Sequence, residues 1–295
     1  MADFIAELGS NHNGDLARAC RLIDECADAG AGAVKVQLFR IEDLFAPEIL
    51  ATHPQLAARE AWEFPLELLA PLAARAHERG LAFGATPFGL WAVDAVADHV
   101  DFLKVASYEL LWHDLLRACA ATGRALIVST GMATDAEIDA GVAVVRAAGA
   151  TELSLLHCVS AYPTPPEQCN LAAIAALRER HGCPVGWSDH SASSSVVERA
   201  VRRWGAEQVE LHVDLPDEAG NEAGAHNWTP ADLAATIAAC TRRPLDDSAP
   251  ADGDGRKRPM PAETPDVAWR ADPSDGLRPL LATRAALLAG AARDG

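Results

Sequence analysis

The sequence predicts a (β/α)8 TIM barrel with a short C-terminal extension. Short β-rich runs alternate with longer Ala/Leu/Arg stretches of helical period, and this alternation continues from the start of the chain to about residue 240. The strand-like runs number eight. Eight successive βα units of this length fit a closed barrel better than an open doubly wound sheet, which periodicity alone does not exclude.

The strands are expected, in order, at residues 3–9, 33–39, 81–88, 100–107, 125–130, 153–160, 184–189 and 208–213. Helices are expected between them, among others at residues 16–30, 65–80, 135–149 and 172–180. Several of these stretches stop at a glycine, which suits a left-handed C-cap. The barrel domain is therefore placed at residues 1–240.

The character of the chain changes after the barrel. Residues 241–265 are rich in Pro, Asp, Gly and charge, which predicts an exposed, mobile connector. Residues 266–295 include a possible helix around "LLATRAALLAG". They are too few for a core of their own, so they are expected to dock on the barrel or on a partner subunit.

The bulk composition excludes several classes of partner. The net charge is −17, from 42 acids against 25 Lys and Arg, which argues against nucleic acid or an anionic membrane as a partner. There is no secretory signal and no apolar run of about 18 residues suited to spanning a bilayer, so a cytoplasmic protein is expected. Seven cysteines without a CxxC pair indicate neither a disulfide framework nor a zinc knuckle.

Two lysines stand where an apolar side chain is expected. The chain has three lysines, and Lys35 and Lys104 both lie inside apolar strands. A buried ammonium without a partner costs several kcal/mol, so two of them in one barrel suggest a bound dianion, such as a phosphate or a phosphate plus a carboxylate. Alternatively, each lysine extends its ammonium to solvent at the rim, or Glu7 is simply an ion-pair partner for one of them.

Polar side chains also gather where the strands end, which is the active-site face of such a barrel. Alternation along a strand places Lys35 with Gln37 and Glu210 with His212 on common faces. Hydroxyl groups from the other strand ends would complete the oxygen contacts of an anion. The side chains at or near the strand ends are Glu7, Gln37, Thr86, Ser107, Ser129, Ser160, Tyr162, Ser188, His190 and His212.

Two histidines suggest a metal site. His190 and His212 close neighbouring strands, and two neutral imidazoles can share Mn, Fe, Co or Zn while leaving positions open for water and substrate. Each could instead be an ordinary hydrogen-bonded histidine. His157, which also lies on a strand, is a rival ligand.

Taken together, these segments resemble the sialic acid synthase family, which makes N-acetylneuraminate and related nonulosonates. The resemblance runs from residue 3 to 240 and rests on "AELGSNHNGD", "AGAGAVKVQLF", "ATPF", "FLKVASYEL", "STGMAT", "LLHCVSAYPTPPEQCNL", "PVGWSDHS" and "VELHV" in family order. It implies a (β/α)8 barrel that condenses phosphoenolpyruvate with an aldose such as N-acetylmannosamine. It also implies a divalent metal, usually Mn2+ with Mg2+, Co2+, Fe2+ or Zn2+ as alternatives, and a homodimer.

The resemblance assigns roles to individual residues. Glu7, Lys35 and Lys104 are the expected catalytic residues, and Glu7 handles a proton or orients water. The phosphoenolpyruvate site and its rim are expected to consist of Glu7, Lys35, Thr86, Lys104, Ser107, Ser129, Tyr162 and Ser188, while Gln37 faces the sugar and His190 and His212 hold the metal.

The chain departs from the family pattern on the acceptor side. Ser160 stands where the family usually has Asn, Leu211 replaces a basic residue, and residues 223–228 are only a loose counterpart of the family segment "GPDH". The residues after the barrel are too few for the antifreeze-like domain that the family usually carries. That domain supplies an arginine to the sugar, and Arg270 or Arg278 could take its place here. Use of phosphoenolpyruvate is therefore better supported than use of N-acetylmannosamine.

Two other functions remain open. A strand lysine with a lowered pKa could form a Schiff base, as in a lysine aldolase. The barrel could also bind phosphoenolpyruvate or a sugar phosphate without catalysing a reaction.

Overall fold

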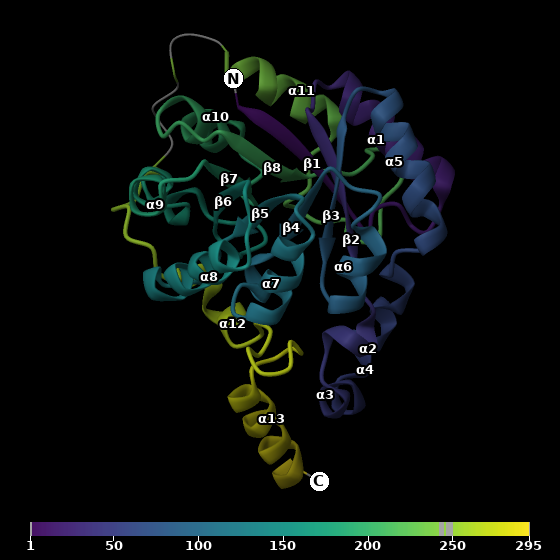
Figure 1. Ribbon diagram of the computed structural model, residues 1–295, viewed down its shortest axis with the longest axis vertical. Coiled ribbons are helices and arrows are strands. Elements are labelled where there is room, and N and C mark those ends of the chain that lie inside the picture. The colour runs from purple at the N-terminus through teal and green to yellow at the C-terminus, as the bar shows by residue number, and fades with distance from the viewer. Residues whose placement is uncertain (1, 242–244, 246–249, 295) are drawn as a thin grey trace.

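Eight parallel strands close into a barrel in the computed structural model, which describes residues 2–241, 245 and 250–294 (Figure 1). Each strand pairs with the next along the chain, and the last pairs with the first. The strands are β1 Asp3–Gly9, β2 Ala33–Leu38, β3 Ala82–Pro87, β4 Phe102–Val105, β5 Ala125–Ser129, β6 Leu153–Cys158, β7 Val185–Asp189 and β8 Gln208–His212. The predicted barrel is confirmed, and every predicted strand end lies within two residues of the observed one.

One main helix follows each strand and packs on the outside of the barrel. These helices are α1 Leu16–Asp28, α5 Leu69–Glu78, α6 Leu90–Val96, α7 His113–Ala121, α8 Asp135–Ala147, α9 Ala173–His181, α10 Ser194–Arg202 and α11 Pro230–Ala239. Their ends follow local chemistry: Thr134 and Glu137 form a capping box at the start of α8, and Gly182 ends α9 in the left-handed conformation. The four predicted helices correspond to α1, α5, α8 and α9.

The barrel interior is apolar at one end and polar at the other. Ile5, Phe102, Ile127 and Leu156 form a small cluster inside the barrel. Further along β1, Glu7 lies opposite Lys35 on β2 and His212 on β8, and Ser188 on β7 lies opposite Glu210 on β8. The register of the parallel strands therefore brings the charged side chains together at the carboxyl ends of the strands.

The connection between β2 and β3 carries short helices that the sequence analysis did not predict. They are α2 Ile41–Leu44, α3 Pro47–Thr52, α4 Pro54–Ala57, η1 Ala58–Trp62 and η2 Leu66–Leu68. Phe39, Phe45 and Phe88 belong to a separate apolar cluster at this end of the barrel, with Trp269 of the C-terminal extension packed against it. This connection therefore forms one side of the mouth of the barrel, at the carboxyl ends of its strands.

The expected exposed connector spans residues 241–265, and its described part, residues 250–265, contains exposed as well as buried side chains. Lys257 is buried and donates to the carbonyl oxygen of Cys158 at 3.0 Å. Glu263 is fully buried and accepts backbone N–H groups from the loops after β5 and β6. Composition alone does not predict these two buried contacts, because the partners lie far away in the sequence. Most of residues 241–249 lies outside the described residues.

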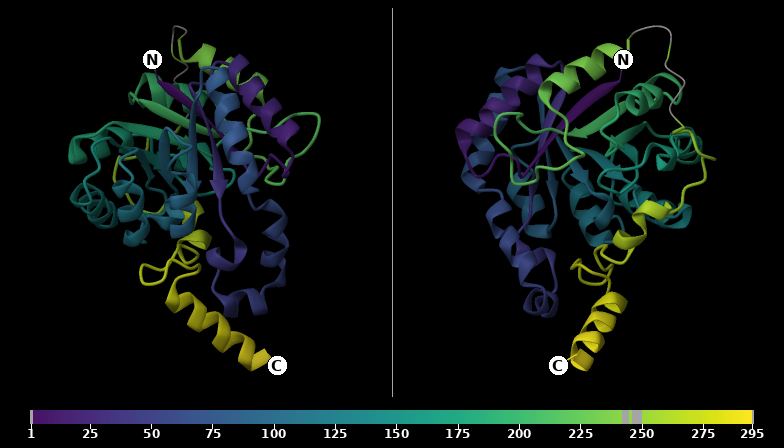
Figure 2. Two further views of the ribbon diagram at one scale, coloured as in Figure 1. Left: turned by 45° about the vertical axis from the view of Figure 1, so that its right-hand side comes forward. Right: turned by 180° about the vertical axis from the view of Figure 1, so that it is seen from behind.

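Residues 250–294, called the C-terminal extension from here on, cross the mouth of the barrel and then project away from it. It contains η5 Pro261–Glu263, α12 Thr264–Val267 and α13 Leu281–Asp294. Helix α13, which includes the predicted helix around residue 285, projects away from the barrel and contacts α3 (Figure 2). None of the described helices is long and apolar enough to cross a membrane.

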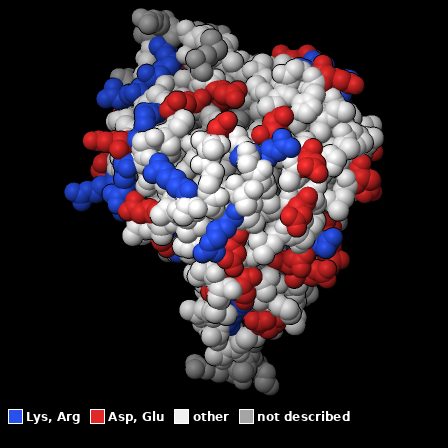
Figure 3. All heavy atoms as spheres, in the orientation of Figure 1, with Lys and Arg blue, Asp and Glu red and all other residues white. Residues whose placement is uncertain are grey.

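On the face shown in Figure 3, Lys and Arg side chains lie mostly on the left and in the centre, and Asp and Glu side chains lie mostly on the right. The basic side chains do not form a continuous surface there. The sequence as a whole has 42 acids against 25 Lys and Arg.

Candidate active site

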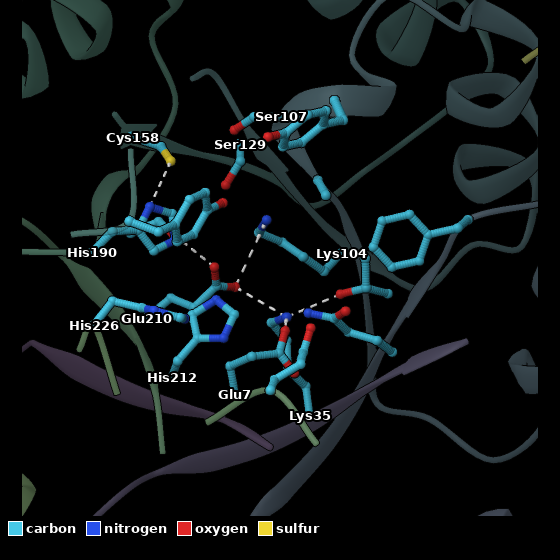
Figure 4. A pocket seen from close by; sticks show the side chains of 18 of the residues that line it. Glu7, Lys35, Lys104, Ser107, Ser129, Cys158, His190, Glu210, His212 and His226 are labelled. Carbon is cyan, nitrogen blue, oxygen red and sulfur yellow. Dashed lines mark hydrogen bonds and ion pairs between the residues drawn. The ribbon is translucent and has the colours of Figure 1, made fainter. Parts of the chain in front are cut away.

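A cavity of about 480 Å³ opens at the carboxyl ends of the barrel strands (Figure 4). Its closed end carries the two strand lysines, each about 2% exposed. Its mouth is formed by the β2–β3 connection, the loop after β8 and the C-terminal extension. The expected site residues that line the cavity are Glu7, Lys35, Gln37, Thr86, Lys104, Ser107, Ser129, Tyr162, Ser188, His190 and His212.

Lys35 is held among three side chains at the closed end of the cavity. Its ammonium pairs with Glu7, lies 3.4 Å from Oε2 of Glu210 and donates to Oγ1 of Thr86 at 2.9 Å. The other oxygen of Glu7 accepts the backbone N–H of Gly9 at 2.8 Å. Glu7 is therefore an ion-pair partner of Lys35, as one alternative predicted, and both residues face the cavity.

Lys104 has fewer protein partners than Lys35. Its ammonium lies 3.7 Å from Glu210 Oε2 and donates to the carbonyl oxygen of Val105 at 3.3 Å. Glu210 is fixed on its other oxygen by the hydroxyl of Ser188 at 2.8 Å. The alternative that the lysines extend to solvent at the rim is excluded, because both ammonium groups are buried and share Glu210.

Burial and charge set the protonation of this cluster. Burial lowers the pKa of Lys35 to about 8. Burial disfavours the ionised form of Glu210, but the ammonium groups of Lys104 and Lys35 outweigh this effect and hold its pKa below the usual range. At neutral pH the cluster therefore contains an ionised Glu210 beside a protonated Lys35.

The geometry of His190 and His212 suits a divalent cation. Their ring centroids are 5.4 Å apart. Nδ1 of His190 faces the carbonyl oxygen of Val159 at 3.0 Å, so Nε2 is the ring nitrogen left to face the cavity. Nδ1 of His212 is buried and has no hydrogen-bond partner among the described residues. Burial lowers the pKa of His212 well below its ordinary value, so this imidazole is neutral and able to bind a metal. Within the described part of the chain, no three His, Cys, Asp or Glu side chains form a metal site by themselves.

The rival ligand His157 does not face the cavity. Its Nε2 contacts the carbonyl oxygen of Cys169 at 2.8 Å, and its ring packs against Trp187. The neighbouring Cys158 lines the cavity instead, with its sulfur 3.8 Å from Nδ1 of His190. The alternation of side chains along β6 explains this difference.

Ser160 is the expected site residue that lies outside the cavity lining. Its backbone N–H donates to Glu263 at 2.7 Å, and its hydroxyl lies 3.9 Å from the sulfur of Cys158. Strand β6 ends at Cys158, so Ser160 lies beyond the strand whose alternation was used to place it.

Several lining residues were absent from the expected site. The sequence predicts Glu210 on the same face as His212, and the structure shows its carboxylate between the two lysines. The loop after β8 adds Glu222 and His226, and the C-terminal extension adds Asp266. The acidic type of Glu210 on a barrel strand was a usable signal, whereas the other three depend on how loops fold back.

The structure distinguishes the two candidate arginines of the extension. Arg278 lines the cavity, where its guanidinium pairs with Glu109 and lies over the ring of Tyr108 at 4.3 Å. Arg270 instead binds Glu137 at 2.9 Å on the other side of the extension. Arg278 is therefore the arginine positioned to reach a molecule in the cavity.

Comparison with known proteins places these features in a family. The family model described as "NeuB family" matches residues 22–244. An uncharacterized protein of Methanocaldococcus jannaschii is 37% identical over 218 residues, which cover 72% of this chain and 61% of that protein. The N,N'-diacetyllegionaminic acid synthase of Campylobacter jejuni is 35% identical over 224 residues, covering 72% of this chain and 67% of the synthase.

A solved structure extends the similarity to most of the chain. The N-acetylneuraminic acid synthetase of Leptospira borgpetersenii, crystallised with citrate, is similar with a TM-score of 0.75 and 31% identity over 90% of each chain. By contrast, this chain spans 61% of the length of the Methanocaldococcus jannaschii protein.

Proposed function

The chain belongs to the NeuB family, and from this membership we propose that it is a synthase that condenses phosphoenolpyruvate with an aldose. The product would be a 3-deoxy-2-keto sugar acid such as N-acetylneuraminate, and phosphate would be released. The observation that carries the proposal is the pair of buried lysines at the closed end of one cavity.

The closed end of the cavity suits the two anionic groups of phosphoenolpyruvate. Lys104 has one distant acid partner at 3.7 Å, so it retains donors for a phosphate or carboxylate. The hydroxyl groups of Ser107 and Ser129 face the same space and can add neutral hydrogen bonds. Glu210 keeps both ammonium groups paired while the cavity is empty, which reduces the cost of burying them.

The proposed reaction forms a C–C bond and a C–O bond from water, and it breaks the C–O bond to phosphate. C3 of phosphoenolpyruvate attacks the aldehyde carbon, water adds at C2, and phosphate leaves with cleavage of its C2–O bond. One proton of the water ends on the former aldehyde oxygen and the other on the released phosphate. The lysines stabilise charge on the phosphate and carboxylate as it redistributes. Both oxygens of Glu7 are already bonded, to Lys35 and to Gly9, so Glu7 suits orienting the water better than carrying a proton.

His190 and His212 would hold the metal that family membership implies. When bound there, a divalent cation, Mn2+ or alternatively Mg2+, Co2+, Fe2+ or Zn2+, would polarise the aldehyde oxygen as a Lewis acid. The protein supplies the imidazoles of His190 and His212, and Tyr162 packs against His190 with a centroid distance of 4.2 Å. This contact fixes the orientation of the His190 ring.

The experiment that tests the function combines turnover with binding. The purified chain should release phosphate from phosphoenolpyruvate when an aldose and Mn2+ are supplied, in a panel that includes N-acetylmannosamine and its 6-phosphate. Lys104→Met should weaken phosphoenolpyruvate binding by about tenfold to a hundredfold, since a charged hydrogen bond contributes about 1.5–3 kcal/mol. The fold should persist, because Glu210 keeps Lys35 and Ser188 as partners. Unchanged affinity by calorimetry would contradict the proposed anion site.

A lysine Schiff-base aldolase is the second candidate function. The observation that favours it is the pKa of Lys35, which burial lowers to about 8, so part of this amine is neutral near physiological pH. Trapping of pyruvate on Lys35 with borohydride would support the aldolase. Phosphate release that requires the aldose would support the synthase.

A further inference from the structure

The C-terminal extension contributes a carboxylate to the mouth of the cavity. Asp266, in the short helix α12, is partly buried and lines the cavity. Its Oδ1 accepts the hydroxyl of Tyr108 at 2.9 Å, whereas no described protein donor is bonded to Oδ2. One oxygen of Asp266 is therefore fixed and the other is available to a molecule in the cavity.

Buried contacts hold this carboxylate in place. Three residues before it, Glu263 accepts the backbone N–H groups of Met132 and Ser160, each at 2.7 Å. Lys257 donates to the carbonyl oxygen of Cys158 at 3.0 Å. These contacts attach the extension to the same loops that shape the cavity, so Asp266 has a defined position at the mouth.

The charges at the mouth differ from those at the closed end. Asp266 lines this end, whereas the carboxyl group of Glu222 accepts the backbone N–H of Ser10 at 2.8 Å beside the end of β1, and burial raises its pKa. Arg278 is already paired with Glu109. Among the described lining residues, Arg59 is the cation without a bonded acid, and it is exposed and lies over Trp62 at 5.2 Å. A phosphate at the mouth would face the carboxylate of Asp266, whereas a hydroxyl or N–H group would find an acceptor there.

We propose that Asp266 is a specificity-determining residue that selects an uncharged, hydroxyl-bearing aldose over a phosphorylated one as the acceptor. The inference rests on the proposed function and names its acceptor class. Oδ2 of Asp266 accepts a hydroxyl or N–H group of the aldose, and its charge repels an acceptor that carries phosphate.

The test compares Asp266→Asn with the wild type on two acceptors, N-acetylmannosamine and its 6-phosphate. The variant keeps the size of the side chain and loses its charge. We expect KM for N-acetylmannosamine to rise about tenfold, because a charged hydrogen bond is roughly twice as strong as a neutral one, while KM for phosphoenolpyruvate stays within about twofold. The preference in kcat/KM for the neutral sugar should fall by about tenfold or more. The matched control is Asp254→Asn, an exposed acid of the same extension that pairs with Arg258 outside the cavity.

Binding of the same two sugars, measured by saturation-transfer NMR in the presence of phosphoenolpyruvate, gives a readout without turnover. Tighter binding of the 6-phosphate by the wild type, the same preference in Asp266→Asn, or no binding of either sugar would overturn the inference. A preference for the neutral sugar that depends on Asp266 would support it even if no aldose supported phosphate release. Absence of phosphate release with every aldose would overturn the proposed function but not the role of Asp266.

Discussion

Lys35 shows how one residue connects the register of the barrel to its chemistry. The strand pairing places Glu7 directly opposite it, and Glu210 and Thr86 complete its surroundings. A lysine in this position would be costly without the carboxylates, and the carboxylates would be costly without the lysine. The ion pairs therefore explain why the two lysines tolerate burial, while the unused donors of Lys104 leave room for an anion.

The pKa of Lys35 predicts how phosphoenolpyruvate binding depends on pH. Burial lowers it to about 8 in the free protein, and a bound anion favours the ammonium form and so raises it. Binding therefore takes up a proton above pH 8, and Kd should increase by up to about tenfold per pH unit there. Calorimetry between pH 7 and pH 10 measures the change in Kd on both sides of the Lys35 pKa of about 8. In Lys35→Met the binding should be weak and should lack this dependence.

The sign for stability is the opposite of the sign for binding. The folded-state pKa of about 8 lies below the ordinary 10.5, so the unfolded chain holds more protons between these two values. The contribution of Lys35 to the free energy of unfolding of the free protein should therefore rise with pH over this window.

At the scale of elements, the strands and the loops differ in how far the sequence predicts them. Local signals suffice for a strand such as β1, whose predicted and observed bounds agree from Asp3 to Gly9. The same alternation correctly places Lys35 and His212 toward the cavity. It does not extend to Ser160, which lies beyond the end of β6 and is not among the residues that line the cavity.

Loops and the extension escape such reasoning because their positions depend on distant partners. Asp266 reaches the cavity because Glu263 accepts backbone N–H groups from distant parts of the chain. One of them belongs to Ser160, 103 residues earlier. Composition reports only that this segment is polar. Whether a polar segment is solvated or packed against unpaired backbone groups is decided by the fold.

Glu263 should therefore be an anchor of the extension. In Glu263→Ala the buried N–H groups of Met132 and Ser160 lose their acceptor, which should lower the free energy of unfolding by about 3 kcal/mol. KM for the aldose should rise as well, because Asp266 and Arg278 lose their support. Chemical denaturation and steady-state kinetics measure the two effects. Glu179→Ala, which removes an exposed acid on α9, should change neither. A loss below about 1 kcal/mol in Glu263→Ala would show that the extension does not need this contact.

The whole molecule and its active site have opposite electrostatic requirements. The chain carries a net charge of −17, while the proposed substrate is an anion that must reach two lysines at the closed end of the cavity. The long-range field of the protein should therefore slow the approach of phosphoenolpyruvate, whereas the short-range lysine contacts stabilise it once it is bound.

Salt separates these two effects because it screens exposed charges more than buried ones. The Debye length falls from about 30 Å at 0.01 M to about 8 Å at 0.15 M ionic strength, which is shorter than the distance across the protein. We expect the association rate constant of phosphoenolpyruvate to rise about twofold as the ionic strength increases over this range. Ligands that are attracted by the charge of a protein show the opposite, since their association slows as salt is added. Stopped-flow fluorescence can follow it through Trp62, which lines the cavity. An association rate that falls with salt would mean that the local cations, including Arg59 and Arg278, govern the field at the mouth despite the acidic surface.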